Sequence, residues 1–205
     1  MSRPSPLANR SAPDGRLHAV AARGLLMGNR GGRLHRADGT LGAARWRSRA
    51  WIACVTRFGG RRRSVWGEGY SEIFFLDEAT ALAAGHRPCF ECRRADATAF
   101  AAAWGRAAGT APPRAAEMDR RLHAERLGPR ERVAASGLPS GAIFAVGERF
   151  FLRTADGVRA WGFGGYGPEC AVGGAAVAVT PACVRAVLAA GYRPMLHPSA
   201  QLSAR

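Results

Sequence analysis

The sequence predicts an α+β protein. We expect an N-terminal β-hairpin, a further strand and short helices around a cysteine-containing turn, followed by a helix and a small antiparallel β meander. Short segments rich in β-branched and aromatic residues alternate with glycine turns, which is typical of strands. Alanine-rich segments with helical spacing end at glycines. The length of 205 residues allows one sizeable core, or two units of about 100 residues each.

The composition is that of a folded protein. Hydrophobic residues make up 47% of the chain, which excludes disorder throughout. No apolar run approaches the ~18 residues of a membrane span, and residues 1–9 lack the apolar core of a signal peptide. We therefore expect a cytoplasmic protein with no membrane partner and with its five cysteines reduced. The oligomeric state is left open.

The net charge of +15 belongs mainly to the first third of the chain. Residues 1–67 contain 14 arginines and two acidic residues, whereas residues 68–205 contain 16 arginines and 13 acidic residues. All 30 basic residues are arginine, so part of the excess reflects a compositional bias. The asymmetry itself favours a polyanionic partner, either DNA or RNA.

The segment before the first helix contains three expected features. Residues 1–22 have no periodicity and predict a mobile basic arm. The GNRGG sequence at 28–32 predicts a structural turn, with an anion-binding loop as the alternative. Residues 50–58 and 61–66 flank a Gly-Gly turn and predict a hairpin.

Two helices are expected next. Residues 70–76 predict a strand, and Asp77 is a suitable N-cap for a short helix that stops at Gly85. A second helix is expected over 95–107, with Phe100 and Trp104 on one face.

The rest of the chain predicts a charged helix over 114–127 and then short strands between 142 and 163, with another at 177–179. A last helix is expected over 181–190. The sequence LAAGYRPMLH after it repeats LAAGHRPCFE at 82–91, which indicates either a decayed duplication or the same helix-ending turn reached twice. The expected division of the chain is an arm (1–22), a cysteine-containing module (23–109), a linker with a charged helix (110–128) and a β-rich domain (129–205).

The C-x-x-C motif in GHRPCFEC is the sequence feature that points most directly to a functional site. Cys89 and Cys92 follow a Gly-x-Arg-Pro turn and precede a helix, which places two thiolates on one tight turn that tetrahedral zinc accepts. A redox dithiol and inert thiols are the alternatives. The turn differs from the C-x-x-C that starts a helix directly after a strand in thioredoxin-like units.

Residues 74–94, FFLDEATALAAGHRPCFECRR, resemble the zinc-binding domain of the Ada alkylation-response proteins and small Ada-like modules. The resemblance covers about a tenth of the chain and implies that Cys89 and Cys92 form the downstream ligand pair. The family has an upstream Cys-x3-Cys pair, one thiolate of which accepts a methyl group from a DNA phosphotriester. Here Cys54 stands upstream, and Phe58 occupies the position of its partner. The arrangement as a whole is similar to a family of bacterial proteins, a similarity that implies no activity.

Some Ada-like modules replace one upstream cysteine with histidine, which makes His35 the natural candidate here and His86 a poorer one. The expected ligand set is therefore Cys89, Cys92, Cys54 and His35, a Cys3His zinc site with no vacant position. In a strand, Cys54 is equally consistent with a small core residue. Cys170 and Cys183 are expected to be buried or incidental.

Three functions remain open. The first is a zinc-binding protein that contacts nucleic acid through Arg45, Arg47, Arg49, Arg61, Arg62 and Arg63. Trp46, Trp51 and Trp66 between these arginines would suit base stacking, although alternating Arg and Trp also describe the two faces of a hairpin. The second is an enzyme, either a thiolate methyl acceptor or a hydrolase using Asp119, His123 and Glu125. No complete catalytic set supports the second function. The third is a scaffold that zinc stabilises.

Overall fold

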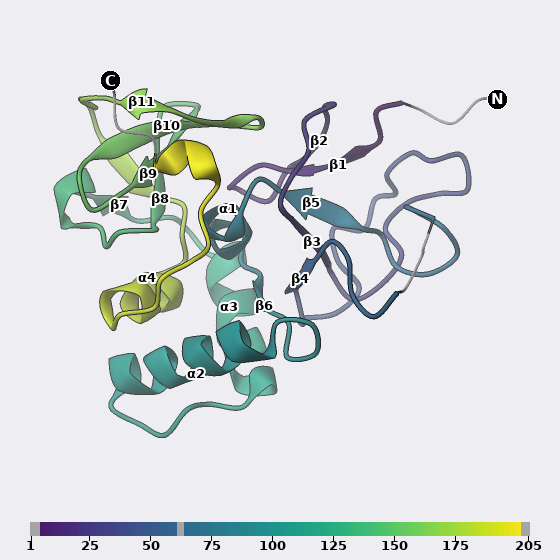
Figure 1. The fold of residues 1–205 in the computed structure, drawn as a ribbon, viewed down its shortest axis with the longest axis horizontal. Coiled ribbons are helices and arrows are strands. Elements are labelled where there is room, and N and C mark those ends of the chain that lie inside the picture. Colours follow the sequence, from purple (N-terminus) through teal and green to yellow (C-terminus); the bar gives the residue numbers. More distant parts are fainter. Residues whose placement is uncertain (1–4, 61–63, 202–205) are drawn as a thin grey trace.

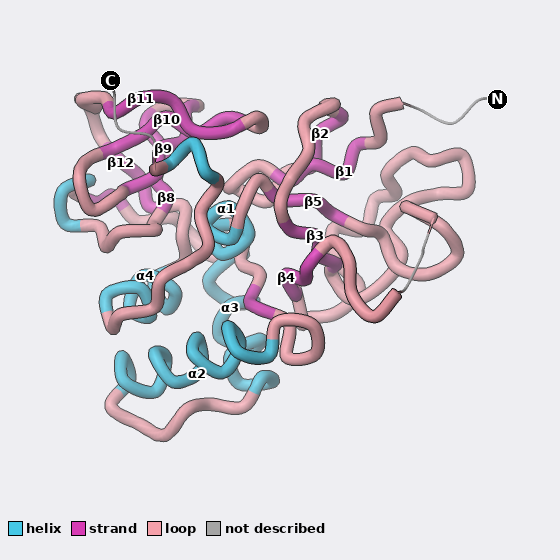
Figure 2. Tube along the Cα trace, viewed as in Figure 1, coloured by secondary structure: helices cyan, strands magenta, loops and turns pink. Residues whose placement is uncertain are grey.

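The fold comprises one mixed sheet and one antiparallel sheet, with helices between and below them (Figures 1 and 2). The computed structural model of the protein describes residues 5–60 and 64–201. Within these residues there are four α-helices and two six-stranded sheets, which confirms the predicted α+β class. None of the helices in this part of the chain has the length and apolar character that a membrane crossing requires.

The first sheet has the strand order β2-β1-β5-β3-β4-β6, with parallel pairing of β1 to β5 and of β4 to β6. Its strands are β1 (Ala8–Ser11), β2 (Leu17–Ala19), β3 (Leu26–Asn29), β4 (Ile52–Val55), β5 (Ile73–Phe75) and β6 (Arg87–Pro88).

The second sheet is antiparallel and has the order β11-β10-β9-β8-β12-β7. Its strands are β7 (Arg132–Val133), β8 (Ile143–Val146), β9 (Arg149–Arg153), β10 (Val158–Gly162), β11 (Gly165–Glu169) and β12 (Ala176–Ala178). The expected meander is therefore present, and β11 and β7 extend it.

The helices are α1 (Glu78–Ala83), α2 (Arg94–Ala108), α3 (Ala115–Leu127) and α4 (Ala182–Ala189). Short 3-10 turns occur at Ala135–Gly137 and Pro198–Ala200. As predicted, Asp77 caps α1: its Oδ1 accepts a hydrogen bond from the amide N of Thr80 at 2.9 Å.

Helix α1 lies between the two sheets, and all six of its residues are buried (Figure 1). Ala79 and Ala83 pack in a core cluster with Ile143 and Leu152 of the second sheet. On the other side, the alanines at 81 and 84 pack with residues of β3 and β5. Small side chains suit a helix that must approach sheets on two sides. Residues from the expected 23–109 and 129–205 segments therefore share one core.

A third cluster joins α2, α3 and α4 to the second sheet, with Phe100, Met118 and Leu188 at its centre. The ring centroids of Phe100 and Trp104 lie 5.9 Å apart, as their spacing predicts. This cluster holds the middle of α2, the helix that follows the cysteine-containing turn.

The repeated LAAG sequences end α1 and α4 with the same turn. Gly85 and Gly191 have φ angles of +81° and +99°, a region that favours glycine. The amide N of His86 donates to the Ala81 carbonyl, and the amide N of Tyr192 donates to the Val187 carbonyl at the equivalent position. The similarity of the two sequences therefore extends to their backbone hydrogen bonds.

Two expectations about the N-terminal third are wrong. The segment expected to be a mobile arm forms β1 and β2, and β1 pairs with β5 through Arg10 and Phe74, which ties it to the first sheet. The hairpin expected after β4 is also not seen in the described part of this segment, where residues 64–66 lie in a loop and β4 pairs with β3 and β6. Arg61, Arg62 and Arg63 lie outside the described residues.

Candidate metal centre

Three cysteine side chains converge at one end of the first sheet. The Sγ atoms of Cys54, Cys89 and Cys92 all lie within 4.8 Å of one another. Among the described residues this is the one group of three or more His, Cys, Asp or Glu side chains close enough to hold a metal ion. Cys54 and Cys89 are 9% and 6% exposed, and Cys92 is half-buried. The structure thus brings together three of the four expected ligands.

The pairing of β4 with β6 explains why Cys54 reaches a turn 35 positions further along the chain. Ala53 and Pro88 are partners in this parallel pair, and the Cys89 amide N donates to the Ala53 carbonyl at 3.0 Å. Cys54 and Cys89 therefore extend from neighbouring strands. The Arg93 amide N donates to the Cys89 carbonyl at 3.1 Å, which closes the turn that places Cys92 beside them.

The local hydrogen bonds favour a thiolate at Cys89. Its pKa is lowered to about 5, first by a hydrogen bond from Cys54 and also by the backbone N–H groups of Cys92 and Glu91. The Glu91 amide N lies 3.4 Å from the Cys89 sulfur. The pKa of Cys54 is raised, first because its thiol donates to Cys89 and then by burial. These hydrogen bonds favour ionisation of one of the three sulfurs, which is the state in which a cysteine binds a metal.

The spacing of the sulfurs fits a tetrahedral thiolate site. Zn–S bonds of about 2.3 Å place the sulfurs of such a site a little under 4 Å apart. The three cysteines meet this requirement with a small inward movement. A pair of thiols in a disulfide would leave the third sulfur buried without a role.

The Gly-x-Arg-Pro turn is fixed by its arginine. Arg87 is buried and forms two hydrogen bonds of 2.8 Å, from Nε and Nη2, to the two carboxylate oxygens of Asp119 on α3. The hydrolase hypothesis uses Asp119 together with His123 and Glu125, but in the structure Asp119 binds Arg87. The His123 ring nitrogen Nδ1 lies 2.9 Å from Nη2 of Arg126. Glu125 binds Arg121 and the Cys183 amide, so these three side chains do not converge.

A cavity of about 760 Å³ adjoins the sulfurs. All three cysteines line it, together with apolar side chains such as Phe74 and polar groups that include Asn29. The carboxylates of Glu72 and Glu91 also lie on its wall, and Oε2 of Glu72 accepts a hydrogen bond from the Trp66 amide at 2.8 Å. Its volume is in the range of small-molecule sites. Sequence reasoning missed Glu72 and Asn29, because only the pairing of β3, β4 and β5 places them near the cysteines.

His35 is not a member of the cluster. Its Nδ1 lies 2.7 Å from the Ser71 hydroxyl, and its Nε2 lies 3.0 Å from the Gly67 carbonyl. The ring stacks on Trp66 at a centroid distance of 5.1 Å. Both ring nitrogens are thus engaged in holding a loop, and the expectation of a Cys3His set is wrong in its fourth ligand. His86 is fully buried against Trp51 and Phe75 and also lies outside the cluster.

The predicted arginine face falls only in part within the described residues. Arg45, Arg47 and Arg49 are exposed. The three arginines at 61–63 lie outside the described residues. Trp51 and Trp66 are each 3% exposed, so they cannot stack on bases as expected.

Comparisons with protein-family models, with curated proteins and with solved structures find no match to this chain. The three-cysteine cluster is compatible with a zinc module of the kind that the Ada resemblance implies.

Proposed function

We propose that this protein binds one zinc ion through Cys54, Cys89 and Cys92 and presents it to the adjoining cavity. The observation that carries the proposal is the convergence of three sulfurs from β4, the end of β6 and the turn before α2. Residues so far apart in the chain meet here because the strand pairing requires it.

The donor set favours zinc among the common metals. Thiolate ligands select zinc, copper(I) and iron–sulfur clusters, whereas calcium, magnesium and manganese prefer oxygen. Three sulfurs around one point suit a single tetrahedral ion. When bound, zinc would keep the three thiols ionised and could polarise a ligand in the cavity.

The described residues supply three ligands, which distinguishes this site from a closed structural one. A structural zinc site has four protein ligands, whereas a site that acts on a small molecule keeps one position for water or substrate. Here the cysteines line a cavity large enough for a small molecule. The geometry therefore supports a reactive or ligand-binding centre over a purely stabilising one.

Metal analysis tests the proposal. We expect wild-type protein purified without chelator to contain about one zinc per chain. Cys54→Ser, Cys89→Ser and Cys92→Ser should each lose most of it, whereas Cys170→Ser, which removes a half-buried cysteine outside the cluster, should keep it. Wild-type protein that is folded and free of zinc under zinc-replete conditions would contradict the proposal.

Association with DNA or RNA is the second candidate function. It is favoured by three exposed arginines on one short segment, Arg45, Arg47 and Arg49, in the most positively charged third of the chain. If DNA is the partner, the low pKa of Cys89 also suits alkyl transfer, in which a thiolate forms a bond to a methyl carbon and a phosphodiester anion leaves.

Two measurements separate these roles. Binding of a short DNA duplex should weaken steeply with salt, and an Arg47→Ser/Arg49→Ser variant should show a smaller salt dependence. Incubation with DNA that carries methyl phosphotriesters should add the mass of one methyl group to the protein if alkyl transfer occurs. If the protein binds DNA but gains no mass, the proposed association with DNA stands and methyl transfer to the protein is excluded.

A further inference from the structure

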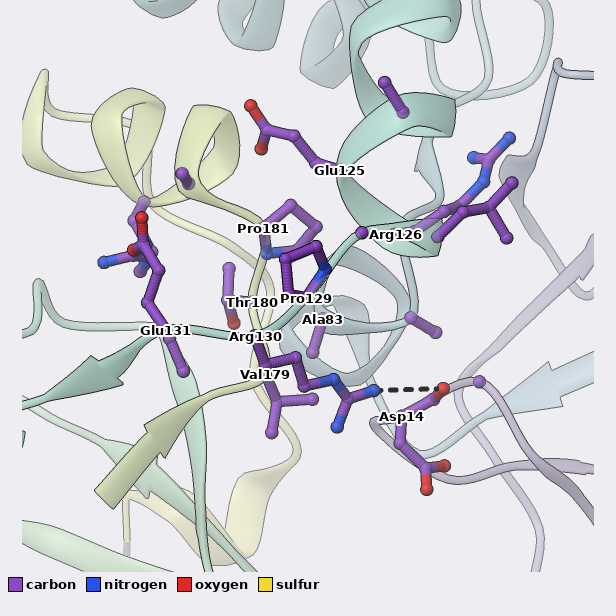
Figure 3. A pocket seen from close by; sticks show the side chains of 18 of the residues that line it. Asp14, Ala83, Glu125, Arg126, Pro129, Arg130, Glu131, Val179, Thr180 and Pro181 are labelled. Carbon is purple, nitrogen blue, oxygen red and sulfur yellow. Dashed lines mark hydrogen bonds and ion pairs between the residues drawn. The ribbon is translucent and has the colours of Figure 1, made fainter. Parts of the chain in front are cut away.

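A second cavity, whose wall does not include the cysteines, lies between the two sheets (Figure 3). Its volume is about 370 Å³. The end of α3 and the loop after it form one wall, β12 and the start of α4 form another, and the turn at Asp14 and Gly15 closes the side towards the first sheet. Its size falls within the range of small-molecule sites.

The acidic residues on the wall of this cavity already have partners. Glu125 pairs with Arg121, and its second oxygen accepts a hydrogen bond from the Cys183 amide at 2.8 Å. Glu131 pairs with Arg185. These acidic side chains are thus neutralised by neighbouring arginines.

Asp14 is also paired, with Arg16. Three further arginines line the cavity: Arg45, Arg126 and Arg130. Among the described residues, none of these three lies within ion-pair distance of a carboxylate. Arg130 extends along the cavity towards Asp14 and contacts only its carbonyl oxygen, at 3.4 Å (Figure 3). The wall therefore carries an excess of positive charge.

A buried arginine adds to this charge from behind the wall. Arg30 is 2% exposed, and its Nη2 donates to the Gly15 carbonyl at 2.8 Å. The guanidinium carbons of Arg30 and Arg126 lie 4.1 Å and 3.8 Å from the ring centroid of Trp51, which itself lines the cavity. The Nε atoms of both arginines are buried without a hydrogen-bond partner.

Two cations this close to one ring repel each other as well as binding to it. The pKa of Arg30 is lowered to about 9, first by burial and then by the charges of Arg126 and Arg45. Burial also lowers the pKa of Arg126 to about 10. An arrangement that disfavours the charged form of arginine is costly for the fold, and a bound anion would remove that cost.

We propose that this cavity binds a small phosphate-bearing molecule, held by Arg45 and Arg130 and attracted by the positive charges of Arg126 and Arg30. The inference does not depend on the metal centre. A phosphate group is favoured over a carboxylate because the guanidinium groups on the wall come from two segments, Arg45 from the loop before β4 and Arg126 and Arg130 from the end of α3 and the loop after it. One carboxylate is satisfied by a single bidentate arginine, whereas a phosphate has oxygens for several.

Inorganic phosphate is the probe that tests the site in the full-length protein. At ionic strength matched with chloride, phosphate should raise the thermal unfolding midpoint of the wild type, and calorimetry should give its dissociation constant. Arg45 and Arg130 are both exposed, so an Arg45→Met/Arg130→Met variant should fold normally. We expect it to bind phosphate at least roughly tenfold more weakly, the loss expected for one charge-assisted hydrogen bond.

Two control variants locate the effect. Arg120→Met, an exposed position on α3 that does not line the cavity, should respond to phosphate as the wild type does. Arg47→Met/Arg49→Met removes charge from the exposed segment beside the cavity and should also keep the response. Equal losses in this variant and in the cavity variant would overturn the proposal, because the phosphate would then bind the exposed segment.

Three other outcomes would also overturn it. The first is a wild type that phosphate does not stabilise. The second is a cavity variant with unchanged affinity. The third is an equal effect of acetate at the same ionic strength, which would show that the cavity does not prefer a phosphate group.

Discussion

Arg93 and Glu78 form an ion pair of 2.9 Å in which the two side chains are only 3% and 2% exposed. Arg93 directly follows the last cysteine of the metal centre, and Glu78 begins α1. The carboxylate also accepts hydrogen bonds from the Tyr192 hydroxyl at 2.7 Å and from the Met195 amide at 2.8 Å. One buried carboxylate therefore joins the cysteine turn, α1 and the segment after α4.

Glu78→Gln should destabilise the protein by about 3 kcal/mol, because removal of one partner leaves a buried charge without full compensation. Urea denaturation followed by circular dichroism measures this change. Glu148→Gln, in the exposed turn between β8 and β9, is the matched control and should change the free energy of unfolding by less than about 0.5 kcal/mol. If Glu78→Gln lowers the free energy of unfolding no more than Glu148→Gln does, the ion pair with Arg93 does not stabilise the protein and the hydrogen bonds to residue 78 are sufficient.

Acid should weaken the fold through His86. The pKa of this fully buried imidazole is held well below its usual value, first by burial and then by the charges of Arg30 and Arg126. In the unfolded chain this imidazole binds a proton near pH 6.5, whereas in the folded chain it stays neutral. The free energy of unfolding therefore falls as the pH drops through that value. The free energy of unfolding, measured between pH 7.5 and about 5.5, should decline less for His86→Leu than for the wild type. Parallel curves for the two proteins would rule out this origin of acid sensitivity.

Replacement of His35 should affect stability and leave the metal content unchanged. His35→Ala removes the ring that bridges the Ser71 hydroxyl and the Gly67 carbonyl and stacks on Trp66. We expect a loss of about 1 to 3 kcal/mol, since both hydrogen bonds of the ring and its stacking on Trp66 are lost, although the Ser71 oxygen still accepts from the amides of Leu34 and His35. Zinc analysis beside Cys92→Ser provides the comparison, and a loss of metal in both variants would return His35 to the ligand set.

The GNRGG turn should be sensitive to a single methyl group. Gly31 has a φ of +82°, and a Cβ there would lie 1.9 Å from the Ser48 hydroxyl oxygen. Gly31→Ala should therefore cost about 2 kcal/mol or more, from the backbone and from the clash together. Gly59→Ala is the control, because its φ is +58° but a Cβ there meets no atom within 4 Å. Thermal unfolding of the two variants separates crowding from backbone strain, and equal effects would show that crowding contributes nothing.

Local signals were sufficient to predict the helices. Asp77, Gly85 and Gly191 mark helix ends through hydrogen bonds that involve neighbours in the sequence, so their roles are visible without tertiary structure. The turn that brings Cys92 beside Cys89 is closed by a local hydrogen bond from the Arg93 amide to the Cys89 carbonyl. The proximity of these two cysteines was therefore predictable from the sequence.

The remaining features depend on pairing between distant segments. Strand β1 has no strong pattern of its own and is held by β5, more than 60 positions later. His35 lies within the expected cysteine-containing module, but both of its ring nitrogens are hydrogen-bonded, one to the Ser71 hydroxyl and one to the Gly67 carbonyl. Trp51 lies among exposed arginines in the sequence, yet its ring is buried between the end of α3 and the first sheet. A pattern of charges alone could not distinguish an exposed aromatic surface from this buried one.

Because α1 is enclosed by both sheets, neither sheet can separate from the other without exposing the helix to water. The protein should melt in a single cooperative step, even though its sequence changes texture near residue 110. A ligand that binds only at Cys54, Cys89 and Cys92 would then also protect the β8–β9 hairpin of the second sheet against unfolding. The unfolding transition followed by the fluorescence of Trp161 would shift when metal binds, although Trp161 does not contact the metal site.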